Sequence, residues 1–230
     1  NNPQVPPSDL IGGGAVKRPI KMDAYGPQTG WGIRSSAGVA IQQSLTASVA
    51  NGGGHLFYNF QPGARFDLEG FYNITNGFYF GVETAFIYNQ ISSIQITSAS
   101  GSESWISGDP NLGYAALYQV PVLLNIRFQI PNSGRFRGYC TGGFGGVWDY
   151  LTASTHTLDE ANLPMTTSRH QWNYAFQLGA GFQYNLLPGL DLDTSFKTFI
   201  TPNPLLFSLN TGPVKSSYSY AIEIGLAYRF

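Results

Sequence analysis

The sequence predicts an all-β protein, an eight-stranded antiparallel transmembrane β-barrel, on three observations. In the last segment, residues 217–230, apolar side chains occupy every second position, which is the period of a β-strand. Aromatic residues make up 15% of the chain and charged residues only 11%, against about 25% charged in ordinary soluble domains. No apolar run in the sequence approaches the roughly 20 residues that a membrane helix needs.

Eight segments with this alternation follow one another, at residues 31–44, 55–72, 78–89, 114–130, 135–152, 170–186, 190–200 and 217–230. In the first four, one phase is apolar: Trp31, Ile33, Val39 and Ile41; Phe60, Phe66, Leu68 and Tyr72; Phe78, Phe80, Val82 and Phe86; and Tyr118, Val120, Val122 and Leu124. Turn residues separate the second segment from the third, where Asn76 and Gly77 end a link of residues 73–77.

The last four segments repeat the pattern. Their apolar phase holds Phe136, Phe144, Trp148 and Tyr150; Trp172, Tyr174, Phe176 and Phe182; Leu190, Leu192, Phe196 and Ile200; and Tyr218, Tyr220, Ile222 and Ile224. The segment 135–152 is rich in glycine but keeps its aromatic phase. The sequences PNSG (131–134) and NLLPG (185–189) make tight turns before the fifth and seventh segments.

Charged residues occupy the opposite phase of these segments. They are Arg34, Arg65, Asp67, Glu69, Glu83, Arg127, Arg135, Arg137, Asp149, Asp191, Asp193, Lys197, Glu223 and Arg229. Apolar residues alone define the phases, so the segregation of the charged residues is an independent observation. An Arg or Lys facing lipid at mid-membrane costs about 2–4 kcal/mol, and the narrow centre of a soluble barrel would be crowded by so many aromatic rings. We therefore expect the apolar phase to face lipid and the charged phase to face the lumen.

The links between segments alternate in length. Residues 73–77, 131–134 and 185–189 are short links, whereas residues 45–54, 90–113, 153–169 and 201–217 are long ones. Membrane barrels of the bacterial outer membrane have short periplasmic turns and long outer loops. This predicts an outer-membrane location with both termini periplasmic. Ten strands are the alternative, because the links 90–113 and 153–169 are long enough to add a hairpin.

Several stretches resemble a known family. The sequences YQVPVLLNIRF, RGYCTGGFGG, AFQLGAGFQYNLL and the ending GLAYRF resemble the small outer-membrane β-barrel proteins related to the OmpA barrel and the opacity proteins. The resemblance covers about residues 31–230 and rests on pattern more than on an invariant motif. It implies outer-membrane lipid as the surroundings. It also implies that the terminal aromatic residues, Tyr228 and Phe230, belong to the signal read by the barrel-assembly machinery.

Nine of the lumen-phase charges are predicted to form an interior ion-pair and hydrogen-bond network, because buried charges need partners. They are Arg65, Glu69, Glu83, Arg127, Asp191, Asp193, Lys197, Glu223 and Arg229. A lumen filled in this way favours a membrane anchor and structural interaction module. The alternative is a narrow porin-like channel for small or hydrophobic solutes.

Enzymatic and nucleic-acid functions are disfavoured. No P-loop, zinc-ligand spacing or nucleophile elbow is present, so we expect no cofactor and no metal. Ser154, His156 and Glu160 could serve a lipid-modifying hydrolase of this fold, but their segment has the polar composition of an ordinary loop. The net charge of −1 argues against a nucleic-acid partner.

Residues 1–30 differ in kind from the barrel domain, residues 31–230. They hold five prolines, a run of three glycines and the basic residues Lys17, Arg18 and Lys21, a composition typical of segments that lack a core. We expect them to dock a protein partner on the periplasmic side, through Leu10, Ile11, Lys17, Arg18, Ile20 and Tyr25. The basic residues would meet an acidic partner or an acidic mouth of the barrel; a partner is favoured over self-plugging.

Overall fold

The computed structural model describes residues 29–48, 54–75, 77–98, 103–107, 115–130, 134–153, 168–202 and 216–230. Its strands are β1 (Gly30–Gln42), β2 (Leu45–Ser48), β3 (Gly54–Phe60), β4 (Gly63–Thr75), β5 (Phe78–Ser98), β6 (Glu103–Ser107), β7 (Ala115–Gln129), β8 (Phe136–Ala153), β9 (Ser168–Leu187), β10 (Leu190–Thr201) and β11 (Ser217–Arg229). The described residues contain no helix able to cross a membrane.

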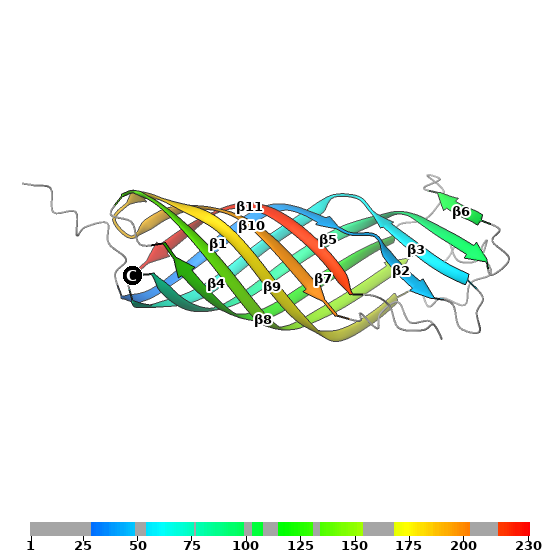
Figure 1. Cartoon of the computed structure of the whole chain (residues 1–230), viewed down its shortest axis with the longest axis horizontal. Coiled ribbons are helices and arrows are strands. Elements are labelled where there is room, and N and C mark those ends of the chain that lie inside the picture. The colour runs from blue at the N-terminus through cyan, green and yellow to red at the C-terminus, as the bar shows by residue number, and fades with distance from the viewer. Residues whose placement is uncertain are drawn as a thin grey trace, which may run out of the picture.

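Eight of these strands close into a barrel. The wall runs β1–β4–β5–β7–β8–β9–β10–β11, and β11 pairs back to β1. Every pairing in the wall is antiparallel, and the strands tilt strongly around the long axis (Figure 1). The predicted eight-stranded barrel is confirmed.

The two ends of the barrel differ as the link lengths predicted. At one end, here called the turn end, β4 meets β5, β7 meets β8 and β9 meets β10 through short links, and β1 starts beside the end of β11. Gly77 and Gly189 lie in two of these turns with φ of 115° and 80°, values that only glycine adopts without strain. The opposite end, the loop end, carries the long links.

Beyond the wall at the loop end, β2, β3 and β6 extend β5 into a small sheet, ordered β2–β3–β5–β6 (Figure 1). The expectation of one strand over residues 55–72 is therefore wrong. Pro62 has no N–H to donate to a neighbouring strand, and a side chain at Gly63 would lie 1.7 Å from the Tyr88 carbonyl oxygen. The strand is therefore interrupted at residues 61–62, between β3 and β4. None of the added strands enters the wall, which excludes the ten-stranded alternative for the described residues.

The outer surface of the barrel is apolar. Leu124 and Leu123 are neighbours on β7, yet Leu124 is 53% exposed on the outside and Leu123 is 1% exposed inside. Aromatic side chains contact one another near the two ends of the wall, as between Trp31 and Tyr72 (5.1 Å between ring centroids) and between Tyr88 and Tyr118 (5.3 Å). An apolar band flanked by aromatic residues is the exterior of a transmembrane barrel.

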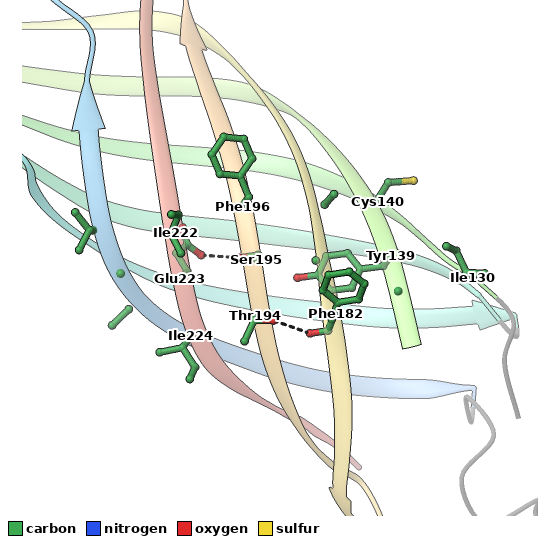
Figure 2. A pocket seen from close by; sticks show the side chains of 16 residues that line it. Ile130, Tyr139, Cys140, Phe182, Thr194, Ser195, Phe196, Ile222, Glu223 and Ile224 are labelled. Carbon is green, nitrogen blue, oxygen red and sulfur yellow. Dashed lines mark hydrogen bonds between the residues drawn. The ribbon is translucent and has the colours of Figure 1, made fainter. Parts of the chain in front are cut away.

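A shallow groove crosses this outer face from β8 to β1. Figure 2 shows the small Thr194 side chain between the larger Phe182 and Ile224, with Cys140 on β8 at the edge of the groove. Behind the groove, the Ser195 hydroxyl donates to Glu223 Oε2 at 3.3 Å. The groove is thus a hollow in the lipid-facing wall, and the charged groups lie on the other side of that wall, in the lumen.

Candidate functional site: the lumen

The lumen is filled by charged side chains. Six basic residues point inward (Arg34, Arg65, Arg127, Arg137, Lys197 and Arg229), together with seven acidic ones (Asp67, Glu69, Glu83, Asp149, Asp191, Asp193 and Glu223). Arg135 is the exception among the fourteen charges assigned to the lumen phase, because it precedes β8 and is exposed. Ion pairs join twelve of these thirteen inward-facing residues into three clusters, and Asp149 belongs to none of them.

The central cluster consists of Arg65, Lys197, Asp67, Glu83 and Glu223. Arg65 lies 2.8 Å from Asp67, 2.8 Å from Glu83 and 2.9 Å from Glu223. Lys197 Nζ lies 3.2 Å from Glu83 and 3.1 Å from Glu223, and it also pairs with Asp67. Two cations therefore hold three carboxylates, and every side chain is at most 4% exposed.

The intermediate cluster lies next toward the turn end and consists of Arg34, Glu69, Arg127 and Asp193. Arg34 pairs with Glu69 and lies 3.3 Å from Asp193. Arg127 lies 3.1 Å from Asp193 and 3.7 Å from Glu69, and its guanidinium stacks 3.7 Å from the centre of the Tyr139 ring. Charges balance in this cluster, two against two.

The turn-end cluster consists of Arg137, Asp191 and Arg229. Arg137 and Asp191 lie at the start of β8 and β10, and Arg229 lies at the end of β11. Both guanidinium groups lie 2.9 Å from the Asp191 carboxylate, one on each oxygen. With exposed Arg135 nearby in sequence, the described charges at this end are three basic and one acidic. Among the described residues, the side-chain charges at this end therefore do not support an acidic mouth as the alternative to an acidic partner.

Amide side chains connect the clusters. Asn125 donates to Glu69 at 3.3 Å and to Glu83 at 2.6 Å, which joins the intermediate and central clusters. Gln183 donates to Asp193 at 2.9 Å. Each of these hydrogen bonds restrains the carboxylate that accepts it, because the partners in such a network hold one another in place.

An apolar layer covers the central cluster on its loop side. It consists of Ala40, Ala85, Ile87, Leu123, Val147, Ala175 and Phe199, all between 0% and 5% exposed. The Arg65 guanidinium lies 5.9 Å from the centre of the Phe199 ring, so the two layers are in contact. On the far side of this layer Asp149 accepts hydrogen bonds from Gln119 (2.8 Å) and Asn173 (2.5 Å).

The nine predicted network residues all lie in the three clusters, but the prediction missed part of the site. Arg34, Asp67 and Arg137 belong to the clusters and were not among the nine. The apolar layer was missed altogether. Its signal was available: Ile87 lies between Phe86 and Tyr88, and Leu123 between Val122 and Leu124, so both phases are apolar at that height.

The remaining predicted residues lie elsewhere. Tyr228 and Phe230 face outward, 47% and 76% exposed, with their rings 5.4 Å apart; their role in assembly stays a prediction. Leu10, Ile11, Lys17, Arg18, Ile20 and Tyr25 lie outside the described residues, as do Ser154, His156 and Glu160. Within the described residues, no group of His, Cys, Asp and Glu side chains could hold a metal ion.

Comparisons with known proteins place the fold. The chain is similar to Neisserial surface protein A (NspA), with a TM-score of 0.54 and 14% identity, covering 88% of this chain and 98% of that one. It is similar to the outer membrane protein OprG from Pseudomonas aeruginosa, with a TM-score of 0.55 and 15% identity, covering 90% and 98%. The outer membrane protease OmpT from Escherichia coli also matches, with a TM-score of 0.51 and 9% identity, covering 87% and 96%.

These likenesses show a shared fold, that of outer-membrane β-barrels. No protein-family model matches the sequence, and no curated protein matches it.

Proposed function

We propose that this chain is an outer-membrane β-barrel with a closed lumen, which acts as a membrane anchor and structural interaction module. The apolar exterior fits a bilayer, and OprG and OmpT, which share the fold, are outer-membrane proteins. The short links at the turn end support a periplasmic position for that end. Residues 1–28 would then enter the periplasm.

The observation that carries the proposal is the filling of the lumen by two kinds of barrier in contact. The ion-pair clusters occupy its turn-side half, and the apolar layer crosses it just beyond. Opening a path would separate buried ion pairs, which is costly because each leaves an uncompensated charge. It would also hydrate a layer of Ile, Leu, Val and Phe side chains, and such constrictions close pores by excluding water.

Conductance tests the closed lumen. The purified, folded barrel in a planar bilayer should show no large, steady openings, because the side chains of both barriers are buried in the lumen and the two barriers are in contact. A general porin added to the same bilayer is the positive control. Steady openings from the wild-type barrel would overturn the proposal and favour the alternative, a narrow channel for small or hydrophobic solutes.

The interaction role is tested by deleting residues 1–24. The barrel should still fold and keep its heat-modifiable migration in gel electrophoresis, because its wall begins at β1. Proteins that co-purify with the full-length chain through this segment should be lost. A matched control replaces the segment with a Gly/Ser linker of equal length. Unchanged companions after the deletion, or failure of the barrel to fold, would contradict docking through this segment.

A further inference from the structure

Asp149 is the one charged side chain of the described lumen that has no ion-pair partner. It is 2% exposed, and its two carboxylate oxygens accept hydrogen bonds from neutral amides, one from Gln119 at 2.8 Å and one from Asn173 at 2.5 Å. The six inward basic side chains all belong to the three clusters, on the other side of the apolar layer. A buried charge without an opposite charge is costly, so this carboxylate favours a cation that the described side chains do not supply.

The surroundings of Asp149 form a polar layer between apolar side chains. Gln119 lies directly opposite Asp149 in the β7–β8 register, and the apolar layer described above lies on the turn side of this pair. On the loop side, Leu117 and Leu151 are also directly opposite each other and are 2% and 5% exposed. On β9, Gln171 lies opposite Asp149 and is only half-buried. The carboxylate is therefore shielded along the barrel axis, and β9 is the side on which a small ion would enter.

The groups around the carboxylate offer oxygen atoms, the ligands that small, hard cations prefer. The two amide donors leave about half of the roughly four lone-pair sites of a carboxylate free. Gln119 Oε1 is buried and accepts no hydrogen bond from any described residue, so it adds a neutral oxygen next to Asp149. Free amide oxygens also occur beside the ion-pair clusters, but there arginine or lysine supplies the positive charge. Among the described lumen carboxylates, only Asp149 lacks that charge.

We propose that Asp149, with the amide groups of Gln119 and Asn173, binds a small monovalent cation, sodium or potassium. A single carboxylate balances one positive charge. Calcium takes about six to eight oxygen ligands, commonly from several carboxylates, and the described residues contain no group of acidic side chains that could hold a metal ion in this way. The site goes beyond the proposed function, because the cation enters and leaves on the loop side without crossing the apolar layer. The bound cation joins β7, β8 and β9 at the end of the barrel that carries the long links.

Unfolding in urea tests the site, because urea adds no ions. The full-length barrel in a zwitterionic detergent is unfolded at constant ionic strength in sodium chloride, in potassium chloride and in the chloride of the bulky cation N-methylglucamine. Sodium or potassium at about ten times its dissociation constant should lower the unfolding equilibrium constant about tenfold. Asp149→Asn keeps the shape of the side chain without its charge and should remove this response. Glu223→Gln is the matched control: it removes a carboxylate that already contacts Arg65 and Lys197, and the response should remain.

A second variant and a direct binding measurement apply if Asp149→Asn does not fold. Gln119→Met keeps the carboxylate and removes one amide, so the stabilisation should need a higher concentration of sodium or potassium. Sodium NMR lines should broaden when the wild-type barrel is added and should sharpen again when potassium competes for the site.

The proposal is overturned if the wild type is equally stable in the three salts, or if Asp149→Asn keeps the full response. A carboxylate that holds a proton in place of the cation would stabilise the barrel as the pH falls, equally in the three salts and only when Asp149 is present. Calcium that stabilises the wild type more than sodium at the same ionic strength would assign the site to a divalent ion. Either of these results also rules out a monovalent cation at Asp149.

Discussion

Replacing Lys197 by Met should lower the free energy of unfolding by about 3–5 kcal/mol, the range measured when one partner of a buried ion pair is removed. Lys197 contacts Asp67, Glu83 and Glu223. Without it, Arg65 alone faces three buried carboxylates. Met has a similar volume, so the loss reports charge more than packing. Equilibrium unfolding in guanidinium chloride, with the barrel in lipid or detergent, measures the change.

A second substitution separates electrostatics from damage to the fold. In Lys197→Met/Glu223→Gln, the cluster regains the charge balance of the wild type, so part of the lost stability should return. Thr198→Val lies next to Lys197 on the lipid-facing side of β10 and should be close to neutral. If Glu223→Gln lowers the free energy of unfolding as much in the Lys197→Met background as in the wild type, the carboxylates are not held by the positive charge of Lys197.

The wall of the barrel follows from the sequence because a strand that separates lipid from a polar lumen must alternate at every position. In β11 this constraint covers the whole segment, from Tyr218 to Tyr228, and the prediction succeeds. It fails for residues 55–72, because Phe60 and Phe66 share a phase although the strand is interrupted between them, at residues 61–62. There the strand is interrupted because Pro62 has no N–H and Gly63 approaches Tyr88 closely. The alternation of apolar and polar residues gives no information on either feature.

The lumen was predictable as a set of charges and not as a set of pairs. Some contacts follow from strand neighbours, since Arg34 lies directly opposite Glu69 in the β1–β4 register. Others cross the barrel: Arg65 donates to Gln177, 112 positions away, at 2.6 Å. Such contacts depend on strand tilt and stagger. The alternation predicts which residues face inward, but it does not predict which of them meet across the lumen. The excess of arginine at the turn end was hidden for the same reason.

Neighbouring leucines on β7 give the sharpest test of which face is which. Leu123→Ala should cost about 2–5 kcal/mol, because it opens a cavity in a layer packed among fixed side chains. Leu124→Ala should cost much less, because lipid chains can fill the space left on the outer wall. Leu124→Arg should cost about 2–4 kcal/mol, because it places a charge in hydrocarbon. Reversible unfolding in bilayers measures all three variants.

Which of the two alanine variants loses more stability shows which face of β7 points to lipid. Leu123 is 1% exposed and Leu124 53% exposed, so a barrel with the opposite orientation would reverse their costs. The depth dependence adds a control: Phe128→Arg lies outward on the same strand but close to the turn end, where the penalty for arginine falls to about 0–1 kcal/mol beyond the loss of the ring. Equal tolerance of arginine at positions 124 and 128, or a larger loss for Leu124→Ala than for Leu123→Ala, would contradict a lipid-facing outer surface.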